Sequence, residues 1–501
     1  MFRLKHLLID TLREHVVMIH EQAVRSGNLG FNPLDRVRVA GADPVTSASR
    51  EIIGVLNFCR DALVGPDEIG LSEEAFHDLG LPEHAPVSAS LAVAPHSVDL
   101  VRDKLNGTRL DRNAFHGILG DVAARRYSRV ELAMFVLACA LQRLDLEELV
   151  DYTHAMINTG QLLHFGPGPI VDKHCIGGVP GNRTTIVVVP ILAALGLTIP
   201  KTSSRAITSP AGTADTMGVL ANVALSAEQM VEVVAKTGGC IAWGGALQLA
   251  PADDVLITVE RPMEIDTEAQ MVVSILAKKK TVSATHVLID IPVGRTAKVR
   301  SYAAAEQLAQ LFRAVAARIN LRLEIAMTDA RAPIGRGIGP RLEALDVLSV
   351  LRCEGNAPQD LREKALHIAS RILEMSGRVA SGSGYREARS ALDSGAAHEK
   401  LIEIIKTQGA REFPPEAPYR HIVPAGADGR IRDIDCWEIA RVAKRAGAPA
   451  NVSAGVRMLR TVGDILSQGD PLFEIHASSL EQLDSAKIYA ESHPSIVRMG
   501  F

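Results

Sequence analysis

The sequence is poor in aromatic residues and carries little net charge. Phe, Trp and Tyr make up only 4% of the 501 residues, so the chain offers few platforms on which single-stranded bases could stack. The formal net charge of -4 also argues against a duplex-binding protein, because such proteins usually carry a basic face. We therefore expect no nucleic-acid partner.

Cysteine and long apolar runs are also scarce. The six cysteines form no Cys-x-x-Cys pair, which disfavours a disulfide framework or a common zinc motif and fits a reducing compartment. The longest uncharged stretch, Thr184 to Pro200, is shorter than the ~20 residues of a spanning helix and contains Pro190. The N-terminus lacks the apolar core and cleavage site of a signal peptide. We expect a cytoplasmic protein with no membrane association and no metal site.

Hydrophobic residues make up 47% of the chain, enough for several buried cores. Short apolar runs between Gly, Pro and Asp indicate a strand-rich N-terminal domain, and helical periodicity follows. Strand, loop and helix then alternate, which is typical of a mostly parallel α/β domain, and a small α+β domain ends the chain. The predicted domains are residues 1–92, 93–165 joined by about 254–282, 166–414, and 415–501.

The α/β domain has five strand candidates, which are Pro169–Val171, Leu197–Pro200, Cys240–Trp243, Val287–Ile291 and Leu323–Met327. In such sheets ligands bind at the carboxyl ends of the strands. The loops that follow these strands are therefore the first places to look for a site.

The first of these loops runs from Lys173 to Thr185. It contains Lys173, His174 and three glycines, and it closes with two threonines. Glycines let backbone N–H groups approach a ligand, and a helix that begins near Arg183 would present free N–H groups and a positive dipole end. The composition predicts an anion site.

A second polar loop runs from Lys201 to Asp215. Its six hydroxyls and Arg205 suit a phosphate, whose oxygens accept many hydrogen bonds. A polar turn in which Thr213 or Asp215 caps the next helix is the alternative for this loop alone. Two such loops on one parallel sheet favour the phosphate site.

Two further segments are ambiguous on their own. Asp266 precedes the helical segment Thr267–Lys280 as an N-cap would, and the run Lys278–Lys280 is typical of a solvated helix end. Ser274 and Lys278 lie four residues apart and share one side of this helix. The segment Ile289–Lys298 reads as a strand that leads into a Gly/Lys turn, which could equally be an ordinary surface turn.

Several familiar motifs are absent from the sequence. It contains no Gly-x-x-x-x-Gly-Lys-Ser/Thr loop, so a Walker-type NTPase is disfavoured. No Gly-x-Gly-x-x-Gly opens a helix near the N-terminus, and the spacing of Gly335, Gly337 and Gly339 does not match it. His-Glu-x-x-His is also missing, which removes the commonest zinc-protease motif.

Two long motifs resemble those of the thymidine and pyrimidine-nucleoside phosphorylase family. They are Asp172-Lys173-His174-Cys175-Ile176-Gly177-Gly178-Val179 and the pair Ser203-Ser204-Arg205-Ala206 with Ala211-Gly212-Thr213-Ala214-Asp215. The resemblance spans nearly the whole chain and is closer to the long branch, which holds the AMP phosphorylases and bacterial proteins that carry the name thymidine phosphorylase. It implies a nucleoside phosphorylase/phosphoribosyltransferase-type fold and an attack of phosphate on C1′ that displaces the base.

The resemblance also implies roles for individual residues. Asp266 matches the proton donor of the AMP phosphorylases, a role that requires a raised pKa, and Lys173 and His174 are the other catalytic candidates. The implied phosphate contacts are Lys173, Cys175, Thr185, Ser203 and Thr213. Cys175 stands where many members have a serine, so one hydroxyl donor becomes a weaker thiol. The implied substrate contacts are Gly178, Ser204, Arg205, Ala206, Ile207, Thr208, Ser209, Thr213, Ser274, Lys278 and Lys298.

The sequence departs from the short thymidine phosphorylases in one place. Those enzymes grip the pyrimidine with a Tyr and an Arg, whereas the equivalent region Leu256–Arg261 is apolar at both positions. This favours a 5′-nucleotide, which needs a second anion site that Arg205 and Lys298 could form. We expect a pentosyltransferase that converts a nucleoside 5′-monophosphate and phosphate to base and ribose 1,5-bisphosphate. The alternatives are a thymidine phosphorylase, a phosphoribosyltransferase and a nucleotide-sensing binding module.

The expected reaction needs inorganic phosphate as a co-substrate and no other cofactor. Phosphorylases of this family are generally homo-oligomers, so the resemblance implies at least a dimer. An apolar helical face around Leu132–Leu141 could serve either an interface or a core.

Overall fold

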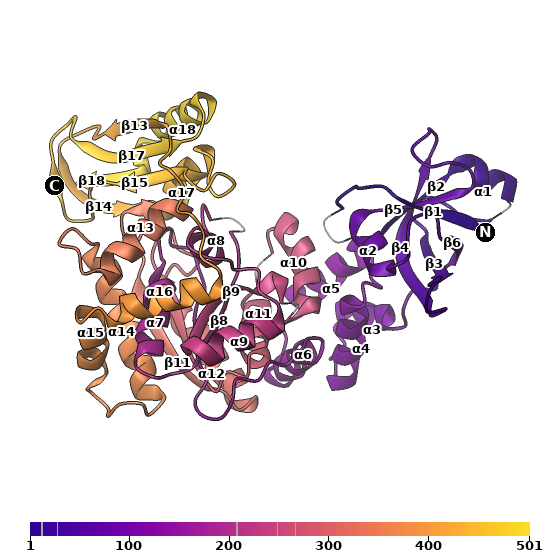
Figure 1. The fold of residues 1–501 in the computed structure, drawn as a ribbon, viewed down its shortest axis with the longest axis horizontal. Helices are drawn as coiled ribbons and strands as arrows, with labels where there is room; N and C mark the ends of the chain where they lie inside the picture. The colour runs from indigo at the N-terminus through magenta and orange to yellow at the C-terminus, as the bar shows by residue number, and fades with distance from the viewer. Residues whose placement is uncertain (12–13, 28, 207–208, 248, 266, 501) are drawn as a thin grey trace. The chain divides into compact units, whose positions relative to one another are not determined.

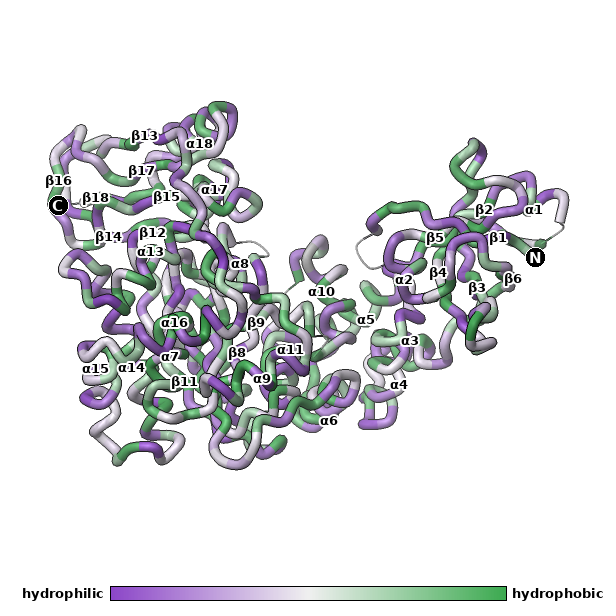
Figure 2. Tube along the Cα trace, viewed as in Figure 1, coloured by the Kyte–Doolittle hydropathy of each residue, from purple (hydrophilic) through white to green (hydrophobic). Residues whose placement is uncertain are grey.

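The computed structural model describes residues 1–11, 14–27, 29–206, 209–247, 249–265 and 267–500. These residues form two compact units, each made of two stretches of the chain. One unit comprises Met1–Gln161 and Ala250–Ala277, and the other comprises Leu162–Leu249 and Lys278–Phe501. Hydrophobic and hydrophilic residues alternate at short intervals in Figure 2, and within the described ranges no helix is long and apolar enough to cross a membrane.

The N-terminal unit begins with a closed six-stranded barrel in the order β1-β5-β2-β4-β3-β6 (Figure 1). Alternate side chains fill its interior, as in β3, where Val37 and Val39 are fully buried and Arg38 is exposed. Two short helices, α1 (Glu21–Gly27) and α2 (Glu73–Leu79), accompany the barrel. The strands are β1 (Phe2–His6), β2 (Val16–His20), β3 (Arg36–Ala42), β4 (Ser49–Cys59), β5 (Glu68–Leu71) and β6 (Pro86–Leu91).

Helices complete this unit. Asp111, Ser128 and Asp145 each accept a backbone N–H at a helix start, which fixes where α4, α5 and α6 begin. The α10 helix returns from far along the chain to pack against α4 and α5. The helices are α3 (Ser97–Leu105), α4 (Arg112–Ala123), α5 (Arg129–Leu141), α6 (Leu146–Asn158), α10 (Pro251–Met263) and α11 (Glu268–Thr281), the last of which crosses the unit boundary.

The second unit is built on five parallel strands. Strands β11, β10 and β7 form one sheet and β8 and β9 another, and a parallel bridge between Ile170 and Thr198 connects the two. The α7 helix is apolar all round and has ten buried residues, so the uncharged stretch after Thr184 is a core helix. The strands are β7 (Val171–Cys175), β8 (Ile199–Ser203), β9 (Gly239–Trp243), β10 (His286–Val293) and β11 (Arg322–Asp329).

Helices surround these strands in the same unit (Figure 1). The α14 helix packs against α7 and β10, and α16 packs against α7 and α9. One continuous hydrophobic core joins their apolar faces to the strands. The helices are α7 (Thr184–Ala194), α8 (Thr213–Gly218), α9 (Ala227–Thr237), α12 (Tyr302–Arg318), α13 (Pro340–Leu351), α14 (Gln359–Met375), α15 (Gly384–Asp393) and α16 (Ala396–Gln408).

The C-terminal part of this unit is an α+β arrangement with its own core. Its larger sheet has the order β12-β15-β17-β13, so it takes in a strand, β12 (Gly337–Ile338), that precedes α13. Gly455 permits this pairing, because a Cβ there would lie 2.1 Å from the carbonyl oxygen of Ile338. The other elements are β13 (Tyr419–Pro424), β14 (Gly429–Ile434), β15 (Gly455–Met458), β16 (Ile465–Leu466), β17 (Pro471–Ala477), β18 (Val497–Gly500), α17 (Cys436–Arg445) and α18 (Leu480–Ser492).

The fold class predicted from the sequence is confirmed, with one local correction. The polar motifs that follow the predicted strands begin inside the observed strands, since β7 extends to Cys175 and β8 to Ser203. Lys173 and Lys201 are therefore buried strand residues, not loop residues.

Candidate active site

The loops after β7 and β10 pack directly against each other. Gly178 has a φ of +88°, and a Cβ at this position would lie 2.6 Å from the backbone nitrogen of Lys298. Only glycine allows this approach. The structure thus brings together two of the segments that the sequence singled out, and Lys298 itself is exposed at their junction.

The loop after β8 is folded back on itself. A Cβ on Gly212 would lie 2.6 Å from the carbonyl oxygen of Ser204, so the beginning and end of this loop touch. The Asp215 carboxylate accepts the N–H groups of Ala206, at 2.6 Å, and of Gly212, at 2.8 Å. Asp215 therefore holds the loop closed and also caps α8, because Gly212 is the N-cap residue of that helix.

Arg183 connects the first loop to the second. Its guanidinium donates to the Thr213 hydroxyl at 2.9 Å and to the Ala211 carbonyl at 3.0 Å. It also forms a buried ion pair with Glu343 on α13, whose carboxylate accepts the Gly339 N–H at 3.1 Å. Burial raises the pKa of Glu343, and the positive charge of Arg183 opposes this rise. A buried ion pair thus fixes the position of Thr213.

Lys173 lies on β7 and is 1% exposed. Its Nζ is 3.5 Å from the Asp290 carboxylate on β10, and it makes no hydrogen bond within the described part of the chain. Lys364 lies 3.0 Å from the same carboxylate. Burial opposes ionisation of Asp290, but these two positive charges outweigh it and lower the pKa of Asp290 to about 2.

A second group of charges surrounds Asp172. Lys279 lies 2.8 Å and Lys201 3.8 Å from its carboxylate. Burial, followed by the charge of Lys279, lowers the pKa of Lys201 to about 7. Burial and the neighbouring lysines also lower the pKa of His174 well below its usual range, so its imidazole is neutral at pH 7. Lys201 is therefore only partly charged at pH 7, but Lys173, Lys279 and the largely buried Lys364 still outnumber the two buried carboxylates, and a bound anion would balance this excess positive charge.

Three other phosphate candidates, Cys175, Thr185 and Ser203, lie on β7, α7 and β8. Asn182 donates to the Cys175 sulfur at 3.3 Å, and burial raises the pKa of the Cys175 thiol, which is protonated at neutral pH. Thr185 is buried in the first turn of α7, where a helix offers free N–H groups. Ser203 ends β8, and the exposed Arg205 that follows stacks on Trp243 with 4.2 Å between its Cζ and the ring centroid.

The contacts described above do not include Ser274 or Lys278. Ser274 lies on α11 in the N-terminal unit, whereas Lys278, one turn further along, belongs to the other. Asp266, Ile207 and Thr208 lie outside the described residues. Ala206 and Ser209 are both partly buried in the second loop, where Ser209 donates to the Ala211 carbonyl at 2.9 Å.

Part of this charge network was not predicted from the sequence. The run Lys278–Lys280 was expected to be a solvated helix end, but Lys279 is 2% exposed and pairs with Asp172, so that interpretation is wrong for Lys279. Asp172 and Lys201 lie at the beginning of the first motif and of the second polar loop, but no role was predicted for either. Asp290 lies in the segment Ile289–Lys298 but had no predicted role, and Lys364 and Glu343 carried no sequence signal, since their partners lie far away along the chain.

The Asp290 contacts predict a specific loss of stability in acid. Because its pKa is lowered from 3.8 to about 2, Asp290 contributes stability that is complete above pH 4 and is lost as the pH falls through 2. The shift corresponds to about 2 kcal/mol. We expect the difference in unfolding free energy between wild type and Asp290→Asn to shrink by this amount from pH 5 toward pH 2, measured by urea unfolding. A difference that stays constant over this range would contradict the assignment.

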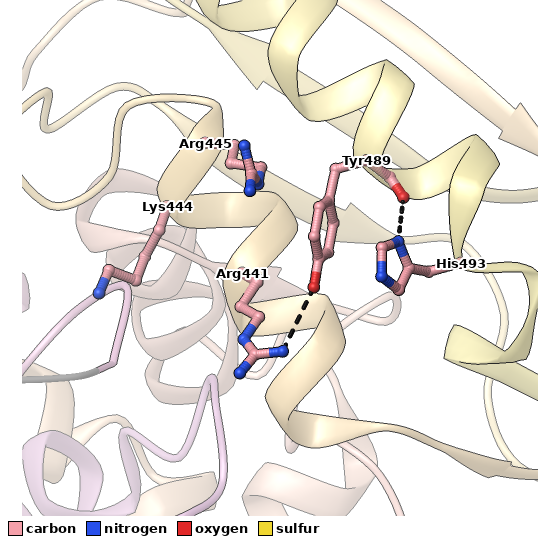
Figure 3. Close-up of a pocket in the computed structure, with 5 residues that line it drawn as sticks. All are labelled: Arg441, Lys444, Arg445, Tyr489 and His493. Atoms are coloured by element: carbon pink, nitrogen blue, oxygen red, sulfur yellow. Dashed lines mark hydrogen bonds between the residues drawn. The ribbon is translucent and has the colours of Figure 1, made fainter. Parts of the chain in front are cut away.

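One pocket lies apart from these residues. Arg441, Lys444 and Arg445 on α17 line it together with Tyr489 and His493, which lie at the end of α18 (Figure 3). Tyr489 is held between the stacked His493 ring and the Arg445 guanidinium. None of the predicted site residues is among those that line this pocket.

Comparison with known proteins identifies the class of enzyme. Residues 167–398 match the model of the glycosyl transferase family a/b domain, and residues 430–494 match the pyrimidine nucleoside phosphorylase C-terminal domain. The structure of anthranilate phosphoribosyltransferase from Thermus thermophilus shares the fold, with a TM-score of 0.53 and 18% identity over 62% of this chain and 99% of that one. The chain is therefore an enzyme of the pentosyltransferase class.

Relatives of full length narrow the class to a family. The chain is 47% identical over 98% of its length to "Putative thymidine phosphorylase 1" of Acidovorax sp. strain JS42, of which it covers 95%. It is 46% identical over 99% of its length to "Putative thymidine phosphorylase" of Polaromonas sp. strain JS666, of which it covers 96%. The chain belongs to the thymidine and pyrimidine-nucleoside phosphorylase family.

Proposed function

We propose that the enzyme catalyses the phosphorolysis of a nucleoside 5′-monophosphate to free base and ribose 1,5-bisphosphate. The observation that carries this proposal is the buried positive excess around Lys173, beside the loops that follow β7 and β8. Such an excess suits an anion that must be stripped of water before it reacts. In a phosphorylase that anion is the nucleophile itself.

Phosphate would bind between the strand ends and the first turn of α7. Lys173 supplies the charge, and the hydroxyls of Thr185, Ser203 and Thr213 supply hydrogen bonds, with the Cys175 thiol as a weaker donor. Arg183 positions Thr213 through its 2.9 Å hydrogen bond without itself being free to bind an ion. A fixed nucleophile lowers the barrier by orientation, because its translational freedom is lost on binding and not in the transition state.

The departing base needs a proton, because the transition state develops positive charge on the sugar and negative charge on the base. We propose Asp266 as the proton donor, on the strength of the match to the AMP phosphorylases. His174, in the first motif, is a further catalytic candidate. Since its imidazole is neutral at pH 7, it adds no further positive charge beside the lysines.

A nucleotide substrate carries a second anion, for which Arg205 and Lys298 are the proposed ligands. Both side chains are exposed on the loops after β8 and β10. Arg205 stacks on Trp243, and within the described ranges it forms no ion pair with a carboxylate. A stacked guanidinium keeps its donors available in a fixed plane, which suits a phosphate group.

The same proposal includes the remaining substrate contacts and the working state of the enzyme. The base and ribose would contact Gly178, Ser204, Ala206, Ile207, Thr208, Ser209, Ser274 and Lys278. The reaction uses inorganic phosphate as its co-substrate and no other cofactor. We further propose that the enzyme acts in the cytoplasm as a homo-oligomer, at least a dimer.

A substrate panel tests the proposed function. Purified enzyme with phosphate should release base from AMP, CMP or UMP faster than from the matching nucleosides, measured by separation of the free base. A thymidine phosphorylase is the second candidate, favoured by the names of the relatives. Release of thymine from thymidine without release of base from any nucleotide would establish that candidate instead.

The second anion site predicts a selective effect of Lys298. We expect Lys298→Met to raise the KM for a nucleoside 5′-monophosphate about tenfold, because one charged contact to phosphate is worth about 1.5–3 kcal/mol at most. The KM for a nucleoside that lacks the phosphate should change little. Initial rates with both substrates measure the ratio, and an equal effect on both would exclude Lys298 as a ligand of the 5′-phosphate.

A further inference from the structure

The N-terminal barrel brings two histidines and a glutamate together on its outer side. His6 is the last residue of β1, and Glu73 and His77 lie four residues apart on α2, so they share one face of that helix. The Nε2 atom of His6 is 2.8 Å from one Glu73 oxygen, and Nε2 of His77 is 3.0 Å from the other. All three donor atoms lie within 4.8 Å of one another.

The backbone around these side chains is fixed on both sides. His6 pairs with Leu71 in the parallel β1–β5 ladder, and the Glu73 N–H donates to the Ile9 carbonyl at 3.0 Å. The His6 ring stacks on Phe76 at 4.1 Å with an interplanar angle of 7°, which sets the direction of its Nε2. The His77 ring meets the His6 ring edge-on at 5.7 Å. The backbone contacts and the ring stacking therefore hold both imidazoles against the same carboxylate.

The exposure of the three residues suits a bound ion. The His6 side chain is 18% exposed, that of Glu73 37% and that of His77 65%, so the cluster is held at its inner end and open to water at its outer end. Glu74 and Asp78, on the same helix, add negative charge nearby, although both pair with Arg125. Two imidazole nitrogens, one carboxylate oxygen and one water form a familiar coordination set for Zn²⁺.

We propose that His6, Glu73 and His77 form a zinc site that joins β1 to α2 and stabilises the barrel. The two imidazoles bind the ion through Nε2, each carrying its proton on Nδ1, and the Glu73 carboxylate binds as the anion. Bonds of about 2 Å require a slight closing of the cluster, which the exposed His77 can provide. The site lies in the N-terminal unit and takes no part in phosphorolysis, so it does not rest on the proposed function.

Metal titration of the full-length protein tests this site. After treatment with a chelator, wild type is titrated with ZnCl₂ by calorimetry and with Co²⁺ by visible absorption. We expect one Zn²⁺ per chain, a Co²⁺ band typical of nitrogen and oxygen ligands, and a higher melting temperature with zinc. His77→Gln and Glu73→Gln should each weaken binding by at least about tenfold, because loss of even the outer partners of metal ligands weakens such sites 10–100-fold.

His96→Gln is the matched control. His96 is also exposed and lies 3.3 Å from a carboxylate, that of Asp99, but within the described chain no second histidine joins this pair. Its variant should bind zinc as wild type does. The proposal is overturned if all four proteins bind alike, if wild type binds no zinc at submillimolar concentration, or if Co²⁺ shows thiolate charge-transfer bands. Far-UV circular dichroism of each variant establishes that the loss of binding is not a loss of folding.

Discussion

Replacing Lys173 by Met is expected to lower kcat/KM for phosphorolysis by about 10²–10³-fold, the cost of removing one strong donor from a preorganised anion site. The side chain is buried, and its Nζ has only an ion pair at 3.5 Å within the described residues. Its positive charge is therefore held in place and can bind the phosphate when it enters the site. The loss should appear as a lower kcat together with a higher KM for phosphate, measured by initial rates at varied phosphate.

Two further variants test whether the effect is specific to the charge and shape of Lys173. Lys236→Met removes an exposed lysine of the same unit, which pairs with Glu232 at 2.6 Å on α9, and it should leave both kinetic constants unchanged. Lys173→Arg keeps the charge but changes its shape, so it should recover only part of the activity. If Lys173→Met changed the KM for the nucleotide and not that for phosphate, Lys173 would not be the phosphate ligand.

The second large effect concerns stability. Arg183→Met should lower the free energy of unfolding by about 3–5 kcal/mol, because it leaves the Glu343 carboxylate buried without its partner. Thermal melting and urea unfolding both report this loss. Since Glu343 in the variant would have a pKa raised by burial, the folded state binds a proton more readily than the unfolded chain. The destabilisation should therefore grow as the pH rises above 4.5, the ordinary pKa of a glutamate.

A double variant separates the ion pair from the packing around it. Arg183→Met with Glu343→Met removes both charges, and an apolar pair of similar size is often as stable as the buried ions that it replaces. We expect the double variant to recover most of the lost stability while remaining poor in activity, because Thr213 has lost its hydrogen bond to Arg183. If the two single losses simply added, Arg183 and Glu343 would not act as a pair.

The sequence predicted the architecture well because local patterns determine most of it. The barrel strands alternate buried and exposed residues, and the segment after Thr184 is apolar on every side, so each pattern has one satisfactory environment. The short strand β12 was not predicted. Its two residues pair with β15, more than a hundred positions later, and no local pattern marks such a pairing.

The site was predictable to the extent that its residues are close in sequence. The glycines and hydroxyls of each of the first two loops stand close together in the chain, and Arg183 joins the two loops through its hydrogen bonds to Thr213 and Ala211. The charge network was not predictable, because Lys279 and Asp172 are 107 residues apart. A lysine at a helix end is normally solvated. Only the folded structure shows that Lys279 pairs with the buried carboxylate of Asp172. Arg183 was likewise expected only to begin a helix, and its pairing with Glu343 spans 160 residues.

The return of α10 and α11 to the N-terminal unit has a consequence for biosynthesis. This unit consists of Met1–Gln161 and Ala250–Ala277, so its helical core lacks two members until the ribosome has also made the first strands of the second unit. The barrel, with all of its strands before residue 92, can close first. The surface of α4 and α5 that α10 covers then stays exposed until more than a hundred further residues have been made, since α5 ends at Leu141 and α10 begins at Pro251. A nascent chain that stalls in this interval would present an apolar surface to chaperones.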